Sequence, residues 1–303
     1  MMKVLRFRDL NNTDMEAYIG FLLLSGVYKS HNESTESLWD ASTGRNIFRL
    51  TMFLEKFKMI SRVIRFDDRQ TRVRRRETDK FSAIRELWGR WVEVLLKLYN
   101  PDMFVTVDEQ LVAFRGRCPF RQYMPSKPAK YGKKFWVLCD NSTSYAWNIQ
   151  PYLGRQPRCA QERHQGLRVV TDLVQGLKGH NATCDNFFTS HDLGQVLLKK
   201  NITMIETIRK NKTTIPPQML VTKGVPKFTS TFAFTKDTTL VGYVPKKGKC
   251  VILQSTLHHD IDVSDGATKK PQIILDYNRT KGGVDTLDKL VSNYTCKRKT
   301  NII

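Results

Sequence analysis

The amino-acid sequence predicts an α/β protein, because helical and extended patterns occupy different parts of the chain. In residues 1–100 apolar side chains recur at helical spacing. From Phe104 onward, short β-rich runs alternate with helical patterns. Residues 211–270 are rich in Lys, Thr, Pro and Gly and fit short antiparallel strands. Strands followed by a strand–helix–strand–helix pattern are typical of the α/β class.

The first 100 residues are expected to be helical. Asn12-Thr13 provides an N-cap ahead of the apolar segment from Ala17 to Val27. Helical spacing predicts two further helices, from Phe48 to Ile64 and from Ile84 to Leu98. The basic segment between them, Arg69 to Arg76, is predicted to be a solvated connector, and a specific DNA contact is the alternative.

Strands and helices are predicted to alternate after Phe104. The expected strands are Phe104 to Asp108, Lys134 to Cys139, Tyr145 to Tyr152, Ala182 to Asp185, Ile202 to Ile208 and Gln272 to Tyr277. The expected helices are Gly166 to Gly176, His191 to Lys200 and Val284 to Tyr294. Residues 211–270 interrupt this pattern, which indicates an inserted β-rich subdomain.

Composition argues against several classes of protein. The longest apolar stretch, Ile19 to Leu24, is too short to span a bilayer, and residues 1–6 lack the apolar centre of a signal peptide. The six cysteines contain no Cys-x-x-Cys spacing, which argues against a zinc site and a disulfide framework. We therefore expect reduced thiols, no zinc and no membrane partner.

The charge indicates nucleic acid as the partner. The formal net charge is +21 and the pI is about 9.8, a balance that attracts polyanions. From Leu111 to Cys139 there is no acidic residue but there are seven basic ones. These candidate DNA-binding residues are Arg115, Arg117, Arg121, Lys127, Lys130, Lys133 and Lys134.

Three aspartates are the candidate catalytic residues. Asp108 and Asp185 end short β-rich runs, and Asp285 opens a helical pattern. Acids that converge in a basic protein suggest Mg²⁺ or Mn²⁺ held beside a phosphate backbone, because both ions prefer hard carboxylate oxygens. The alternatives are ordinary: Asp185-Asn186 also fits a turn, and an acid in the first turn of a helix is favoured by the helix dipole.

The sequence motifs around these aspartates resemble those of piggyBac-type DNA transposases. The first motif is Thr106 to Leu111, followed by Phe114 to Arg121. Further motifs are Lys127 to Gly132, Pro151 to Arg155, Gly179 to Ser190, Tyr277 to Asp288 and Arg298 to Asn301. A looser likeness upstream includes Gly44-Arg45, Ile47 to Arg49 and Arg65 to Asp68. The resemblance covers nearly the whole chain in order.

This resemblance implies an RNase H-like catalytic core with an N-terminal helical domain and a β-rich insertion. It implies a helical dimerisation and DNA-binding domain (1–103, first half) and a catalytic domain (104–210 and 271–294). It also implies an insertion domain (211–270) and a truncated start of a returning helical segment (295–303). Asp108, Asp185 and Asp285 would bind two Mg²⁺ or Mn²⁺ ions, and Asp288 matches an additional acidic catalytic position.

The resemblance also implies an activity and a setting. The family cuts and pastes double-stranded DNA at TTAA sites, so a nuclear location and a possible homodimer are expected. The chain stops at Ile303, where the family continues into more helical sequence and a Cys-rich zinc domain. The alternatives are therefore a transposon-derived DNA-binding protein without transposition activity, or a non-functional truncated copy. Glu206, where the family usually has Gly, adds an acid near the core.

Overall fold

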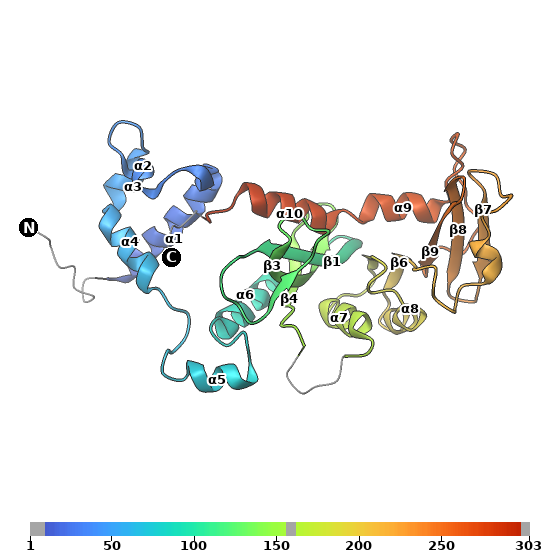
Figure 1. The fold of residues 1–303 in the computed structure, drawn as a ribbon, viewed down its shortest axis with the longest axis horizontal. Helices are drawn as coiled ribbons and strands as arrows, with labels where there is room; N and C mark the ends of the chain where they lie inside the picture. The colour runs from blue at the N-terminus through green and yellow to red at the C-terminus, as the bar shows by residue number, and fades with distance from the viewer. Residues whose placement is uncertain (1–9, 156–161, 298–303) are drawn as a thin grey trace, which may run out of the picture. The chain divides into compact units, whose positions relative to one another are not determined.

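The computed structural model describes residues 10–155 and 162–297, and within this range it confirms the α/β class (Figure 1). Two compact units are present: residues up to Arg72 together with those from Asp288 onward, and Val73–Leu287. The predicted domain boundaries remain a prediction. Cys159 and the predicted segment from Arg298 onward lie outside the described residues.

The first unit contains α1 (Asn12–Val27), η2 (Ser30–Asn32), α2 (Thr35–Trp39), α3 (Asn46–Thr51) and α4 (Leu54–Val63). These elements bury an aromatic cluster that includes Phe21, Phe48 and Phe57. The N-cap of α1 is Asn11, one residue before the predicted Asn12-Thr13, and it forms a capping box with Asp14.

Two helical predictions for this part of the chain were wrong in detail. The single helix predicted from Phe48 to Ile64 is divided between α3 and α4 at an extended Met52. The Trp39 indole donates a hydrogen bond to the Met52 carbonyl at 2.7 Å, and Met52 itself is buried, which stabilises the break. The predicted connector from Arg69 to Arg76 contains α5 (Arg72–Thr78), because arginine and glutamate favour helix once a few are adjacent.

The second unit is built on a mixed sheet. After α6 (Arg85–Leu98), its strands are β1 (Phe104–Ala113), β2 (Arg121–Tyr123), β3 (Tyr131–Asp140), β4 (Ala146–Pro151), β5 (Asn181–Cys184) and β6 (Thr203–Thr207). Strands β1, β5 and β6 are parallel, and β3 pairs antiparallel with β1 on one edge and with β2 and β4 on the other. The predicted strands at β1, β3, β4, β5 and β6 are confirmed.

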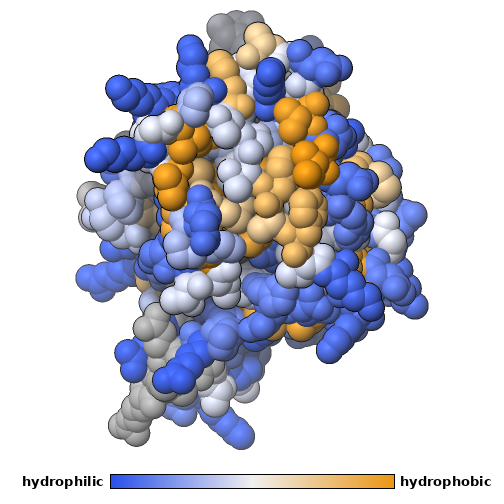
Figure 2. Space-filling view, turned by 90° about the vertical axis from the view of Figure 1, so that its right-hand side faces the viewer, coloured by the Kyte–Doolittle hydropathy of each residue, from blue (hydrophilic) through white to orange (hydrophobic). Residues whose placement is uncertain are grey.

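The β-rich residues extend this sheet. After η3 (Pro217–Leu220), strands β7 (Ser230–Phe234), β8 (Thr239–Lys246) and β9 (Lys249–Ser255) form an antiparallel meander, and β9 pairs with β6. The end of the sheet formed by this meander carries apolar side chains between hydrophilic ones (Figure 2). The insertion therefore continues the sheet through backbone hydrogen bonds between β6 and β9.

Helices cover both faces of the sheet. Helices α7 (Gln165–Leu173) and α8 (His191–Leu198) pack on one face, against Val105 and Val107 among others. Helix α9 (Gln272–Thr280) packs on the other face, against Ile205 (Figure 1). Because side chains alternate between faces along a strand, Thr106 and Asp108 point toward the α9 side.

The strand predicted from Gln272 to Tyr277 is wrong, since these residues belong to α9. The run Ile273-Ile274-Leu275 is too short for its periodicity to distinguish a strand from a buried helix. The position beside β6 that such a strand would need is occupied by β9. The other predicted helices are confirmed at α7, α8 and α10 (Gly283–Asn293).

Candidate active site

Two of the predicted acids lie where the parallel pairing of β1 and β5 ends. The pairing runs up to Val107 and Cys184, so Asp108 and Asp185 are the next residues. Carboxyl ends of parallel strands meet at one edge of a sheet, and this is where α/β proteins place their sites. Strand β1 continues to Ala113 along β3, which corrects the prediction that the strand ends at Asp108.

The third predicted acid reaches the same place from a helix. A cavity of about 170 Å³ lies at this edge of the sheet. Its lining residues are Thr106, Val107, Asp108, Thr183, Cys184, Asp185, Tyr277, Lys281 and Asp285. Asp288, three residues further along α10, falls in the other compact unit and is not among the described residues that line the cavity. The structure thus brings together three of the four predicted catalytic residues.

The electrostatics of the cavity make Asp108 the unusual carboxylate. Burial, together with the smaller effect of the neighbouring Asp185 and Glu109 carboxylates, raises the pKa of Asp108 to about 7. The hydrogen bond that the Glu109 amide donates to Asp108 Oδ1, at 2.7 Å, and the nearby Lys127 ammonium act in the opposite direction. A bound cation would favour the ionised form of this side chain.

A close backbone approach brings Asp285 to the sheet. Gly282 separates α9 from α10, and Gly283 then packs against β1. A Cβ atom at Gly283 would lie 2.8 Å from Thr106 Oγ1 and 3.1 Å from Thr106 Cβ. Only glycine therefore permits the start of α10, and with it Asp285, to lie this close to β1.

Replacing Gly283 by alanine is expected to destabilise the second unit by about 1–3 kcal/mol, the usual cost of overpacking a core. The matched control is Gly282→Ala, because a Cβ there would meet no atom within 4 Å. Urea unfolding of both variants measures the difference. Equal free energies of unfolding for the two variants would contradict the close-approach explanation.

The carboxylates fit a hard divalent cation by chemistry rather than by a ready-made ligand shell. Carboxylate oxygens are the ligands that Mg²⁺ and Mn²⁺ prefer, and the pKa of Asp108 is raised mainly because burial disfavours its ionised form. Among the described residues, no three His, Cys, Asp or Glu side chains are close enough to form a metal site as they stand. The buried Cys184 and Cys250 are free thiols.

Comparison with known proteins agrees with this arrangement. A family model described as Transposase IS4 matches residues 4–302, nearly the whole chain. The chain belongs to this transposase family. Its architecture matches that of the piggyBac transposase synaptic complex with hairpin DNA at a TM-score of 0.91 and 40% identity, over 99% of this chain and 63% of the other. The predicted piggyBac-type membership and RNase H-like core are thereby confirmed.

Curated relatives show the same membership at lower identity. The human PiggyBac transposable element-derived protein 3 is 24% identical over 313 residues, which cover 94% of this chain and 50% of the relative. The human Chimeric ERCC6-PGBD3 protein is also 24% identical, over 28% of its length. The chain thus spans about half, or less, of the curated relatives it matches.

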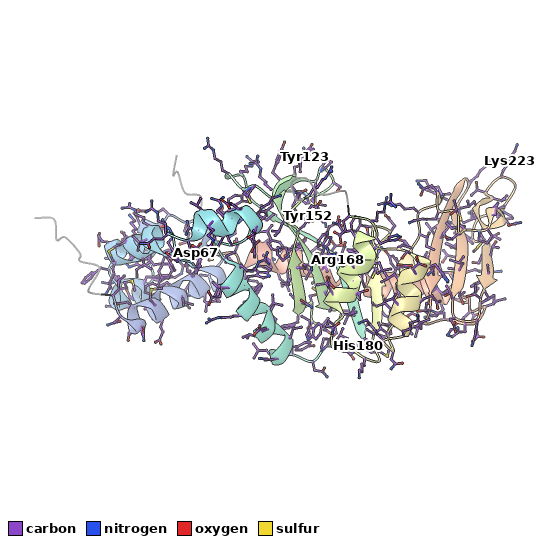
Figure 3. The ribbon with its side chains drawn as sticks, turned by 90° about the horizontal axis from the view of Figure 1, so that it is seen from below. Asp67, Tyr123, Tyr152, Arg168, His180 and Lys223 are labelled. Carbon is purple, nitrogen blue, oxygen red and sulfur yellow. The ribbon has the colours of Figure 1, made fainter. Side chains whose placement is uncertain are left out.

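In this piggyBac-type transposase core, the acid-free basic segment forms a hairpin arm beyond the cavity. Strands β1, β2 and β3 carry it, and Tyr123 lies at its outer end, whereas His180, just before β5, lies at the opposite end of the strands (Figure 3). Arg115 and Arg121 border a hollow of about 660 Å³ with Tyr131. Arg115, Arg117, Arg121 and Lys130 are exposed, so their charges are available to a phosphate backbone.

Three of the predicted DNA-binding lysines are engaged within the protein. Lys134 pairs with Glu109 at 3.8 Å, lies over the Phe187 ring, and leaves only 13% of its side chain exposed. Lys127 donates a hydrogen bond to the Glu109 carbonyl at 2.9 Å, and Lys133 lies 4.2 Å from the Phe114 ring centroid. A DNA contact by Lys134 remains a prediction, although its burial does not favour it.

Sequence reasoning did not single out two residues that line the cavity. The side chain of Tyr277 is partly buried, and this burial together with the Asp185 and Asp108 carboxylates raises its pKa to about 12. Lys281 lies at the end of α9 with its ammonium 5.6 Å from the Tyr277 ring centroid. Both residues belong to the motif from Tyr277 to Asp288, and this was the sequence feature that could have indicated them.

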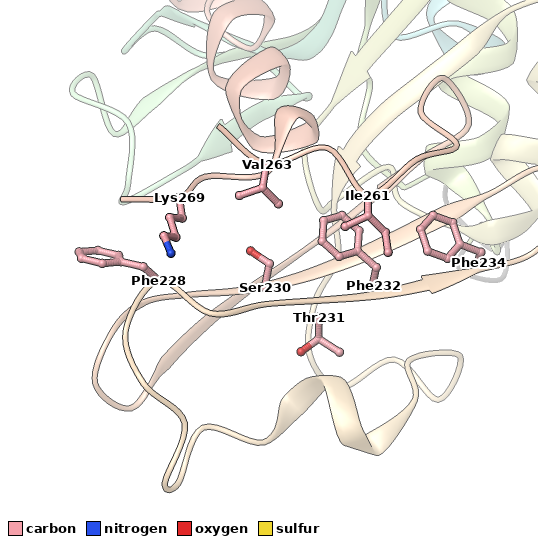
Figure 4. A pocket seen from close by; sticks show the side chains of 8 residues that line it. All are labelled: Phe228, Ser230, Thr231, Phe232, Phe234, Ile261, Val263 and Lys269. Carbon is pink, nitrogen blue, oxygen red and sulfur yellow. The ribbon is translucent and has the colours of Figure 1, made fainter. Parts of the chain in front are cut away.

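A larger hollow elsewhere has no such chemistry. It measures about 520 Å³ and lies between β7 and the loop that follows β9. Phe232, Phe234 and Ser230 point into it, and Thr231 points away (Figure 4). Its lining includes one charged residue, Lys269, and no carboxylate. The cavity that holds the three aspartates is therefore the candidate site.

Proposed function

We propose that this chain carries the catalytic part of a piggyBac-type transposase, which cleaves double-stranded DNA and transfers strands at TTAA sites. The observation that carries the proposal is the convergence of Asp108, Asp185 and Asp285 on one cavity, at the carboxyl ends of two parallel strands. Family membership and the 40% identity to a piggyBac transposase of known structure support it.

In the proposed mechanism, Asp108, Asp185 and Asp285 hold the divalent ions, and Asp288 is an additional acidic catalytic residue. Two Mg²⁺ or Mn²⁺ ions would activate the attacking hydroxyl and stabilise the leaving oxygen of the phosphodiester. Asp108 must lose its proton to take part, and it is poised to do so near neutral pH. Lys281 at the cavity supplies a positive charge for the phosphate.

We propose the order of DNA steps from the resemblance to piggyBac-type transposases. Water-driven nicking would free a 3′-hydroxyl, which attacks the opposite strand to form a hairpin. The hairpin is reopened, and the 3′ ends then join target DNA. We propose a nuclear location and a homodimer for the same reason. Among the described residues no helix is both long and apolar enough to cross a lipid bilayer.

A second candidate function is DNA binding without strand cleavage. The net charge of +21 and the exposed arginines of the hairpin arm favour it independently of the cavity. The chain also spans about half of its curated human relative, so end recognition by the rest of such a protein is a separate question.

One assay separates the two functions. End-labelled duplexes that carry TTAA at an element end, or a scrambled tetranucleotide, are incubated with the protein and Mg²⁺, Mn²⁺ or EDTA. The transposase proposal expects nicks that need both the metal and TTAA. Binding in a gel-shift assay without metal-dependent nicks would favour the second function and overturn the first.

Salt dependence tests the hairpin arm. The double variant Arg115→Ala, Arg117→Ala is expected to reduce the magnitude of the slope of log K against log salt by about 2. Each phosphate contact contributes about 0.9 to that slope, and the variant removes two contacts. The matched control is Lys199→Ala, Lys200→Ala at the end of α8, which removes the same charge elsewhere. Fluorescence anisotropy over a series of salt concentrations gives both slopes, and identical slopes would remove the arm from the DNA interface.

A further inference from the structure

A pair of buried threonines lies directly behind the two strand aspartates. Thr106 and Thr183 face each other in the parallel register of β1 and β5 and are 2% and 1% exposed. Each stands two residues before an aspartate, so hydroxyl and carboxylate lie on the same face of the sheet. Both threonines also line the cavity.

Both hydroxyls bind the last residue of α9. Thr106 Oγ1 donates to the Thr280 carbonyl at 2.5 Å, and Thr183 Oγ1 lies 2.7 Å from Thr280 Oγ1. The single hydroxyl hydrogen of Thr280 is already donated to the Asp276 carbonyl at 2.7 Å, so Thr183 is the donor in this pair. Thr280 is fully buried, and all three hydroxyls are thereby satisfied.

The position of Thr280 determines where Asp285 can lie. Thr280 ends α9, and Asp285 follows five residues later in the first turn of α10. Between them, Gly283 contacts Thr106 itself. The segment that carries the third acid is therefore fixed, by hydrogen bonds and by packing, to the strands that carry the first two.

A second set of hydrogen bonds holds α9 to the loop after β9. His258 Nε2 lies 2.9 Å from Asp276 Oδ2, and His258 Nδ1 lies 2.8 Å from Ser255 Oγ. Ser255 is fully buried, so this Ser-His-Asp chain fixes the helix and presents no nucleophile to solvent. It holds α9 against the end of β9 independently of Thr106, Thr183 and Thr280. The helix can therefore remain in place when one threonine hydroxyl is removed.

We propose that Thr106, Thr183 and Thr280 form a hydroxyl clamp that positions the three catalytic aspartates for divalent-metal binding. They are positioning residues that act through the segments bearing Asp108, Asp185 and Asp285. This inference rests on the proposed function. A merely structural threonine cluster would change stability without changing the affinity for metal.

The test compares Thr280→Val, which keeps the shape but removes the hydroxyl, with Thr280→Ser, which keeps the hydroxyl. Mn²⁺ binding followed by electron paramagnetic resonance, without DNA, is the first readout. Thr280→Val is expected to weaken Mn²⁺ binding about 10–100-fold, the usual effect of losing a group that orients metal ligands. Thr280→Ser is expected to stay near the parent. The Mn²⁺ concentration for half-maximal nicking should shift in parallel.

The controls separate the possible failures. Thr203→Val removes a threonine hydroxyl that bonds Asn181 Oδ1 at 3.0 Å, at the opposite end of β5 and β6, and it should leave Mn²⁺ binding unchanged. Thr183→Val repeats the test if Thr280→Val does not fold. Unchanged Mn²⁺ affinity in folded Thr280→Val and Thr183→Val, with Asp108→Asn still abolishing binding, overturns the clamp alone. Unchanged binding in Asp108→Asn overturns the proposed function.

Discussion

Replacing Asp108 by asparagine is expected to reduce metal-dependent nicking of TTAA-containing DNA by about 10³-fold or more, the scale set by losing an essential catalytic group. Asparagine keeps the size and the hydrogen bond that Asp108 Oδ1 accepts from the Glu109 amide, but it removes the negative charge. Nicked product is measured on denaturing gels at saturating Mg²⁺ and Mn²⁺. Asp185→Asn and Asp285→Asn should behave alike, because all three residues line one cavity.

Asp192→Asn is the matched control for this loss. Asp192 is an exposed aspartate in the first turn of α8 and is absent from the described lining of the cavity. It should nick at the rate of the parent. Nicking by Asp108→Asn at the parental rate, under conditions where the parent depends on metal, would remove the aspartates from the mechanism.

The same substitution should not destabilise the protein without metal. The pKa of Asp108 is raised in the folded state, so the folded chain holds this proton more tightly than the unfolded chain. The associated stability is present below about pH 4 and is lost as the pH rises toward 7. Asparagine avoids this loss and is expected to stabilise the fold at pH 8 by at most about 4 kcal/mol, at about 1.4 kcal/mol per pKa unit. Lost activity with retained stability identifies a catalytic role.

The sequence predicts the strand-borne part of the site well. Two long and specific motifs carry it, Thr106 to Leu111 and Gly179 to Ser190. Parallel pairing of β1 with β5 follows from the ordinary α/β pattern. In that topology the carboxyl ends of β1 and β5 are adjacent. The fold class and the motifs are therefore enough to predict that Asp108 and Asp185 lie close together.

The helical part of the site was harder to predict from the sequence. The segment from Gln272 to Tyr277 was predicted as a strand because its apolar run has no decisive period. The strand that pairs with β6 is β9, which precedes this segment in the chain and was predicted to belong to a separate subdomain. The clamp at Thr280 depends on contacts over 97 and 174 residues, and no local pattern encodes such contacts.

Charge alone does not distinguish exposed basic residues from those engaged within the protein. Lys134 belongs to the basic segment by sequence, but alternation along β3 turns it toward Glu109 and the Phe187 ring. Arg115 and Arg117 lie in the connection between β1 and β2 and are exposed. A count of positive residues therefore does not show which of them are exposed, whereas the strand register does.

Glu206 is the position where the sequence and the core conflict most directly. Its side chain is fully buried in β6, and both carboxylate oxygens lack a hydrogen-bond partner among the described residues. The nearby Thr189 hydroxyl has two other acceptors for its single hydrogen, the Thr207 carbonyl at 2.6 Å and the Asp185 carbonyl at 3.0 Å. Desolvation raises the pKa of Glu206 well above its usual value, and the Asp185 carboxylate adds to the shift.

Glu206→Met is expected to raise the free energy of unfolding at pH 8 by about 1–3 kcal/mol, the usual cost of a buried polar group without a partner. Methionine has similar length and no charge, so it fills the same space. Because the pKa is raised in the folded state, Glu206 contributes stability only below its ordinary value near 4.5 and loses it as the pH rises. The advantage of the variant should therefore be smallest near pH 4.5, where the buried carboxyl group is neutral, and should grow toward pH 8.

Urea unfolding at several pH values measures this difference, with Glu93→Met on the exposed face of α6 as the matched control. The control should change stability little and equally at every pH. A Glu206→Met advantage that does not vary with pH would mean that the pKa of Glu206 is the same in the folded and unfolded chains. A loss of stability at pH 8 would mean that the Glu206 carboxylate has a partner that stabilises its charge, such as the nearby Lys212 ammonium.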